Sequence, residues 1–456
     1  MIIIVSKFFF VVVTLVSSCF SFVESHAYDV SMAIDVALQN NQKIAAAKER
    51  VNVSSGRENV ALASLLPTAN WGYTIATVKD ARTFTGQKVE RDISENASLQ
   101  VSCNIFKSGA DMMEIVSSNA DKNADTYGFY DTVTKIVAQV ILSYEKILHD
   151  KSVVVIRKRQ KKYYEGALEK AKIKFSLGVI ASSDLAEAEY QMANSVSQLT
   201  TAEETLKEEK GKFRYLTGTE FPEDNIKLSH VDFSSVSIPA SLDALIDITM
   251  QYNDTIAQSS FAYKKEKAHS VAALSRLGPS VDVSYNIAPD TSQSVYDSET
   301  SAYLFGGRTV SLNVKMPIFV PVDYTRIYTQ NSEKNRAKIV WRDAKAVAVE
   351  EAKKLWGRME SNMVLMKARE AALIHRTKLA KDTAVEYEVG TKNFSDSMRA
   401  QVDAYEAEIA FYDSVLYYTI SIVEMLSNAG TLKYLSPKVL IGKEWIQPVE
   451  CGNENA

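Results

Sequence analysis

Two long stretches of this 456-residue chain recur further along it after one fixed step and without a gap. Residues 33–76 and 175–218 are both matched 212 positions later. The matched pairs include Asp35 with Asp247, Asn41 with Asn253, Pro67 with Pro279, Gly178 with Gly390, and Ser183-Asp184 with Ser395-Asp396. A repeat of this length is a structural half and not the unit of a solenoid, so we predict a tandem duplication. Two similar halves suit a ring or a tube better than an enzyme cleft.

The duplication and the N-terminus divide the chain. Residues 1–27 are typical of a secretory signal peptide, with Lys7 before an apolar run and Ala27 at the cleavage site. Cys19 follows Val-Ser-Ser, which is an alternative lipidation site, and both readings take the chain out of the cytoplasm. We expect repeat 1 over 28–240, repeat 2 over 241–436 and a C-terminal tail over 437–456.

Composition and motifs indicate no enzyme. The net charge of −4 gives no reason to expect nucleic-acid binding, and we interpret the basic cluster at 157–162 as the solvated face of a helix. Three cysteines make no disulfide framework, and the five histidines lack metal-ligand spacing, so we expect neither a metal nor a cofactor. The chain has no phosphate-binding glycine loop, nucleophile elbow or zinc-protease motif.

Two proline-free segments predict unusually long helices. Proline is absent between Pro67 and Pro222 and again between Pro321 and Pro437. Continuous helices over about 108–175 and 323–387 would each be roughly 100 Å long, which implies coiled-coil-like packing. The return helices that follow carry apolar residues at alternating steps of four and three over 185–206 and 398–426.

Four short segments alternate between apolar and polar residues, as strands with one apolar face do. They form two predicted hairpins, at about 68–106 and 280–318, with tips near 80–92 and 289–302. Alternation of this kind is typical of half-buried soluble sheets and also of membrane barrels. After the signal peptide we find no apolar stretch long enough for a membrane helix, so any insertion must use these strands. Four strands cannot close a barrel, which needs about eight. Two chains would supply eight strands and three would supply twelve, and a polar lumen wide enough for cargo favours three chains.

The order of these elements resembles the TolC family of outer-membrane efflux and secretion channels. Each half runs helix, "SLLP" or "RLGP", hairpin, a strand ending in Ile-Phe, long helix, glycine turn and return helix. The resemblance implies a homotrimer in the outer membrane of a Gram-negative bacterium. In it a twelve-stranded β-barrel is continued by a periplasmic α-helical barrel that holds most of the mass.

The resemblance also implies a function. The channel would passively conduct substrates outward in a tripartite efflux or type I secretion system, together with a periplasmic adaptor protein and an inner-membrane transporter. The alternative is a periplasmic coiled-coil adaptor or scaffold that does not span the outer membrane. The transported substrate and any role of Cys103 stay open.

The two glycine turns carry the candidate site residues. Gly178 and Gly390 suit the left-handed residue that ends a helix. We expect N-caps of the return helices among Ser183, Asp184, Ser395 and Asp396, with Asp184 and Glu187 as a capping box. By resemblance, the periplasmic gate would link Ser183 and Asp184 to Tyr387 and Lys392, and the adaptor-docking turns would be Gly178, Val179, Gly390 and Thr391.

Asp396 matches the first acidic position of the family's narrowest pore ring. The second acidic position, three residues on, is Arg399 in this chain. Three inward-facing arginines would offset the field of three aspartates or pair with them one helical turn away. The resemblance therefore implies a pore constriction at Asp396 and Arg399 but leaves its ion selectivity open.

Overall fold

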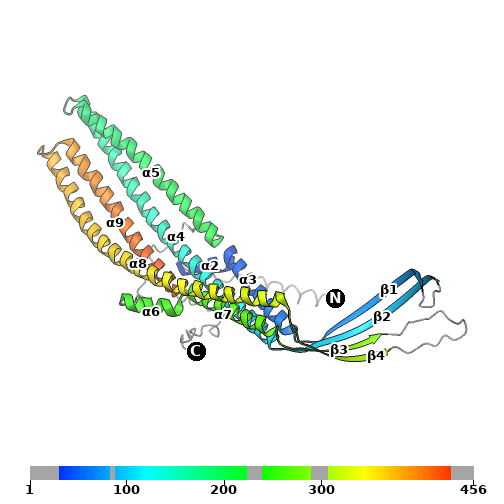
Figure 1. The fold of residues 1–456 in the computed structure, drawn as a ribbon. Coiled ribbons are helices and arrows are strands. Elements are labelled where there is room, and N and C mark those ends of the chain that lie inside the picture. Colours follow the sequence, from blue (N-terminus) through cyan, green and yellow to red (C-terminus); the bar gives the residue numbers. More distant parts are fainter. Residues whose placement is uncertain (1–29, 83–87, 223–238, 289–306, 433–456) are drawn as a thin grey trace, which may run out of the picture. The chain divides into compact units, whose positions relative to one another are not determined.

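A computed structural model describes residues 30–82, 88–222, 239–288 and 307–432 (Figure 1). The predicted signal peptide, Cys19, Cys451 and the C-terminal tail lie outside these ranges. The first half contains α2 (Val30–Asn40), α3 (Gln42–Ala63), β1 (Thr68–Arg82), β2 (Lys88–Lys107), α4 (Ala110–Ser176) and α5 (Ser182–Thr217). The second half contains α6 (Leu242–Tyr252), α7 (Asp254–Ser275), β3 (Ser280–Ala288), β4 (Gly307–Lys315), α8 (Pro321–Glu388) and α9 (Phe394–Asn428).

The element bounds repeat with the step found in the sequence. Adding 212 to the bounds of α2 and α3 gives those of α6 and α7. The order helix, helix, strand, strand, long helix, return helix then occurs in both halves. This agreement supports the predicted duplication.

The chain folds into two compact units, each of which draws on both halves. Among the described residues, unit 1 comprises 30–42, 133–222, 239–245 and 352–432, and unit 2 comprises 43–82, 88–132, 246–288 and 307–351. Unit 2 holds the sheet, and unit 1 holds the ends of the long helices with their turns. The compact units thus cut across the two predicted repeats.

The four strands form one antiparallel sheet in the order β1-β2-β3-β4. The pairing places apolar residues in rows across it. Trp71 pairs with Leu99 and Leu99 with Ile287; Cys103 pairs with Val283 and Val283 with Leu312. Polar residues make up the alternate rows, for example Ser102, Ser284 and Ser311. The predicted division into one apolar and one polar face is therefore confirmed.

The first hairpin is longer than predicted. We expected a tip near 80–92, but β1 continues to Arg82 and β2 begins at Lys88, with Ala81 opposite Val89. The bonds between antiparallel strands join backbone groups, so pairing continues where the apolar alternation of side chains stops. What remains of the two predicted tips, 83–87 and 289–302, lies outside the described residues.

The two long helices are confirmed. The predicted helix at 108–175 is α4, which begins after Ser108 and Gly109, both with positive φ. The predicted helix at 323–387 is α8, which begins at Pro321. Proline suits a first helical position because the missing N–H would have no partner there.

One expectation about membrane helices is corrected. Among the described helices, α9 is long and apolar enough to cross a membrane by length and composition. However, 44% of its apolar window is buried inside the protein, and α9 also carries Glu406, Glu408 and Asp413, which pair with cations on α4. Its apolar side chains, such as Val423, Met425 and Leu426, are core residues. We therefore interpret α9 as a core helix of unit 1.

Candidate functional site at the helix turns and the α4–α9 seam

Two turns of the same backbone geometry end the long helices. Gly178, with φ of 70°, donates to the carbonyl of Phe175, and Val179 donates to that of Lys174. Gly390 and Thr391 make the corresponding bonds at the end of α8, to Tyr387 and Glu386. This is the glycine-ended arrangement that satisfies the last carbonyls of a helix. The predicted role of Gly178 and Gly390 in ending the helices is confirmed.

The predicted N-caps are wrong. The cap of α5 is Ala181, which has no side-chain capping bond, and the cap of α9 is Asn393, whose side-chain oxygen accepts from the Asp396 N–H at 2.7 Å. Ser183 and Asp184, like Ser395 and Asp396, lie inside the first turn of their helices, so Asp184 and Glu187 form no capping box. The two helices start two or three residues earlier than expected. In the first turn, the aspartates interact favourably with the positive end of the helix dipole.

Lys174 connects the two turns. Its Nζ donates a hydrogen bond of 2.8 Å to Tyr387 Oη and lies 4.5 Å from the centre of the Tyr387 ring. The Tyr387 ring meets Phe394 edge-on at 5.8 Å. Beneath these contacts is a small core formed by Tyr164, Ala171, Ala188, Phe394 and Met398. The ends of α4–α5 and α8–α9 therefore pack together within unit 1, as Figure 1 also shows. Lys174 was not among the site residues predicted from the sequence.

The four predicted gate residues lie close to this contact but are not joined as expected. Among the described residues of one protomer, no hydrogen bond or ion pair links Ser183 or Asp184 to Tyr387 or Lys392. Tyr387 instead bonds to Lys174. Lys392 and Ser183 are exposed, and Asp184 is half-buried. The gate assignment stays a prediction.

The residues of the predicted constriction make no ion pair within the described part of one protomer. Asp396 and Arg399 are both exposed on α9. In the described part of the chain neither side chain forms an ion pair, so the possible pairing one turn apart is not seen. Their place in a pore stays a prediction.

The tips of both turns expose apolar side chains. Val179, a predicted docking residue, is 67% exposed, and Leu177 and Val389 beside the two glycines are 71% and 73% exposed. Gly178, Gly390 and Thr391 are exposed as well. Clustered apolar exposure of this kind is typical of a surface that binds a partner. Leu177 and Val389 were not predicted.

Further along the same helices, cations on α4 face carboxylates on α9. Arg157 binds Glu406 through two hydrogen bonds, Arg159 pairs with Glu408, and His149 pairs with Asp413. We call these three pairs the α4–α9 seam. The interpretation of 157–162 as a solvated face is wrong for Arg157, whose side chain is only 13% exposed. The cations of α4 lie on several faces of the helix, and their partners are about 250 positions away in the sequence. The sequence around Arg157 therefore does not indicate which of these cations contacts a neighbouring helix.

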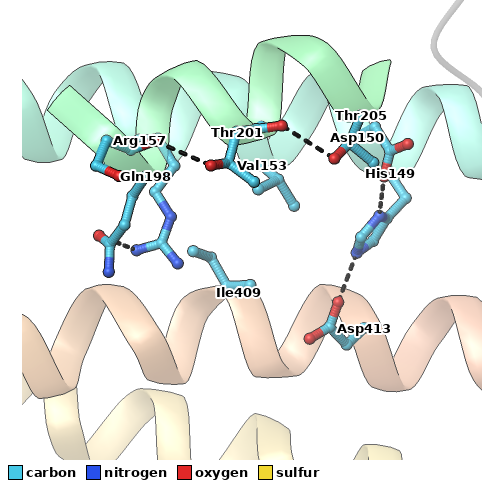
Figure 2. A pocket seen from close by; sticks show the side chains of 11 residues that line it. His149, Asp150, Val153, Arg157, Gln198, Thr201, Thr205, Ile409 and Asp413 are labelled. Atoms are coloured by element: carbon cyan, nitrogen blue, oxygen red, sulfur yellow. Dashed lines mark hydrogen bonds and ion pairs between the residues drawn. The ribbon is translucent and has the colours of Figure 1, made fainter. Parts of the chain in front are cut away.

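Beside the seam lies a pocket of about 340 Å³ between α4, α5 and α9 (Figure 2). His149 and Asp150 on α4 and Asp413 on α9 line one part of it, and Arg157 and Gln198 line another. The Arg157 guanidinium donates to the Gln198 side-chain oxygen at 3.0 Å. In Figure 2 the His149 ring lies between Asp150 and Asp413. Among the described residues, no group of His, Cys, Asp and Glu has the arrangement of a metal site.

Comparison with known proteins finds similarity to one protein family and to one of its relatives. Residues 33–219 match the family described as outer membrane efflux protein. The outer membrane protein TolC of Vibrio cholerae is 21% identical over 305 residues, which are 65% of this chain and 68% of that protein.

Solved structures show the same fold. Structures of CusC, which describe its folding and transmembrane channel formation, superpose with a TM-score of 0.78 at 14% identity, over 88% of this chain and 91% of theirs. The Campylobacter jejuni CmeC outer membrane channel gives a TM-score of 0.78 at 16% identity, over 88% of this chain and 85% of that one.

Proposed function

Because this chain belongs to the TolC family of outer membrane efflux proteins, we propose that it is the outer-membrane exit channel of a tripartite efflux or type I secretion system. It is an outer-membrane protein with a large helical part in the periplasm. It conducts substrates passively, and the energy comes from an inner-membrane transporter. A periplasmic adaptor protein connects the two.

The observation that carries this proposal is the apolar face of the sheet. Val310, Leu312 and Val314 on β4 are 72%, 64% and 64% exposed, and Trp71 on β1 is 72% exposed. A soluble sheet rarely leaves such a row of large apolar side chains in water, whereas a lipid-facing strand needs them.

The sheet also has two unpaired edges, β1 and β4, within the described residues. Open sheet edges are not tolerated in the hydrocarbon core, so lipid insertion requires other copies of the chain to pair with them. We propose a homotrimer in which three four-stranded sheets close one barrel of twelve strands. A periplasmic scaffold, the alternative function, has no use for this face.

Fractionation and cross-linking test the location and the assembly. The full chain should resist extraction of outer-membrane fractions by high salt or carbonate, come out in detergent, and cross-link as a trimer. Release by salt wash as a water-soluble monomer would contradict the channel and favour the scaffold.

We further propose that Ser183, Asp184, Tyr387 and Lys392 form the closed entrance, with links made between protomers. Asp184→Asn and Lys392→Gln should then both raise the single-channel conductance in planar bilayers. Lys207→Gln is the matched control, because Lys207 is a 78% exposed lysine on α5 whose partner is Glu204 on the same helix. If both variants conduct like the wild type, the gate assignment is wrong while the channel itself stands.

A further inference from the structure

His149 holds two carboxylates at once. Its Nδ1 lies 2.9 Å from Asp150 Oδ1, and its Nε2 lies 2.8 Å from Asp413 Oδ1 on the neighbouring helix α9 (Figure 2). A neutral imidazole has one N–H and can donate to only one of them, whereas the imidazolium donates to both. Carboxylates accept and do not donate when ionised. The geometry therefore fits the charged ring.

Asp150 depends on this charge. Its side chain is only 7% exposed, and its Oδ2 is buried with no hydrogen-bond partner in the structure. If the imidazole lost one proton, the N–H that remains could still donate to Asp150, but the buried carboxylate would lose the positive charge that offsets its own, which is strongly unfavourable. Asp413 is different, because its side chain is 42% exposed and water can solvate it.

Among the described residues that line the pocket, His149 is the one group with an ordinary pKa near neutral pH. The α5 wall of the pocket consists of Ser197, Gln198, Thr201, Ala202 and Thr205, which are uncharged, and α9 contributes Ile409 and Asp413. Arg157 on α4 lines the pocket too, but a guanidinium keeps its proton at any accessible pH. Among the residues that line the pocket, the response to neutral and mildly alkaline pH therefore depends on His149.

The direction of the response follows from the pKa of His149. Burial on its own would lower this pKa, but the hydrogen bonds and charges of Asp150 and Asp413 outweigh burial and raise it to about 9. A raised pKa in the packed state means that protonation stabilises that state. The stabilisation is complete below the ordinary value of about 6.5, declines above it, and is lost as the pH rises through about 9.

We propose that His149 is a pH-sensitive latch between α4 and α9: its imidazolium holds Asp413 of α9 against Asp150 of α4, and loss of the proton releases that end of the seam. The Arg157–Glu406 and Arg159–Glu408 pairs contain no histidine and hold the rest of the seam. The latch concerns the packing of the two helix pairs and does not depend on what the channel transports.

Thiol labelling of the purified full-length protein tests the latch. Ser414 is next to Asp413 and only 2% exposed, so S414C places a nearly isosteric thiol in the seam. Cys103 and Cys451 are changed to serine, and the same background without S414C gives the blank rate. Dividing each rate by that of the unfolded protein at the same pH removes the titration of the thiol itself. The normalised rate should rise roughly tenfold to a hundredfold between pH 7 and pH 10.

Two further variants distinguish release of the latch by loss of the His149 proton from a general loosening of the packing between α4 and α9. Asp413→Asn should raise the normalised rate already at pH 7 and reduce the rise between pH 7 and pH 10 at least threefold. Glu406→Gln weakens a pair that does not involve His149, so it should raise the rate similarly at both pH values and keep the wild-type ratio. A normalised rate in the S414C protein that is the same at pH 7 and pH 10 would overturn the proposal, as would an unchanged pH ratio in Asp413→Asn.

Discussion

The ammonium group of Lys174 donates to the phenol oxygen of Tyr387 at 2.8 Å, across 213 positions of sequence. The bond joins the end of α4 to the end of α8, and the same ammonium lies 4.5 Å from the centre of the Tyr387 ring. One lysine thus makes a polar and a cation–π contact to the other long helix. The bond links the ends of the two long helices directly, and the first prediction concerns it.

Tyr387→Phe should loosen the turns slightly, and Lys174→Met should loosen them more. The first change removes the hydrogen-bond acceptor but keeps the ring that contacts Lys174 and Phe394, so the cost is about 1 kcal/mol. The second removes the hydrogen bond and the cation–π contact, adding about 0.5–1 kcal/mol. If the turns close the channel, conductance in planar bilayers should increase in that order. Tyr190→Phe, at a 60% exposed tyrosine of α5, should have no effect; an inverted order would speak against a role for the bond.

Arg399 should reduce the preference of the channel for cations. If Asp396 and Arg399 both face the pore, Arg399→Asp makes the field more negative and should move the reversal potential under a salt gradient towards the cation value. Asp396→Asn should move it the opposite way, and raising the ionic strength should shrink both shifts. Identical reversal potentials in both variants would place these charges away from the pore.

Leu312→Lys should prevent membrane assembly, whereas Asn313→Lys should be tolerated. Leu312 is 64% exposed on the apolar face of the sheet, and Asn313 is its neighbour on the polar face. A lysine on the lipid side of a strand costs about 2–4 kcal/mol near the membrane midplane, while the lumen side accepts charge. The yield of detergent-extracted trimer on a non-denaturing gel measures the difference. Equal yields from the two variants would contradict the lipid-facing assignment.

Asp121→Asn should destabilise unit 2. Asp121 on α4 accepts from Lys265 on α7 at 2.9 Å and from Arg57 on α3 at 3.2 Å. Burial on its own would raise the pKa of Asp121, but these two cations outweigh it and lower the pKa. Removing the charge should cost about 1 kcal/mol, because both cations are partly exposed to water.

The melting temperature followed by circular dichroism measures this loss. The lowered pKa means that the stabilisation is present above the ordinary aspartate value of about 3.8 and disappears as the pH falls through the lowered one. The variant should therefore melt below the wild type at pH 7 and together with it in strong acid. Glu333→Gln, in an exposed pair with Arg336, should leave the melting temperature nearly unchanged at both pH values.

Much of the fold could be predicted because its signals are local and repeated. The absence of proline determined where α4 and α8 run, and the alternation of side chains identified all four strands. Glycine at 178 and 390 marked the helix ends, since glycine reaches positive φ at low cost. The N-cap predictions were wrong because Ser, Asp and Asn are all good caps, and three such residues lie within four positions at the second turn. Residue preference alone does not choose between neighbouring candidates.

The α4–α9 seam could not be predicted from the amino-acid sequence. Its pairs join α4 to α9 across about 250 positions, and the single sequence does not say which face of a long, mostly charged helix meets which neighbour. His149 showed this most clearly, because a lone histidine carries no motif. Lys174 is similar, since nothing near it in the sequence indicates Tyr387 as its partner.

The two glycine turns share a backbone but not their side chains, with Val-Ile after Gly178 and Thr-Lys after Gly390. In a threefold assembly the rim of helix ends would look sixfold in shape and remain threefold in chemistry. A protein that binds this rim would meet two kinds of turn in alternation, one apolar and one that adds the charge of Lys392 to an exposed valine. It could therefore distinguish neighbouring positions around the rim. A mutation in either turn would weaken every second contact with the partner and leave the others unchanged.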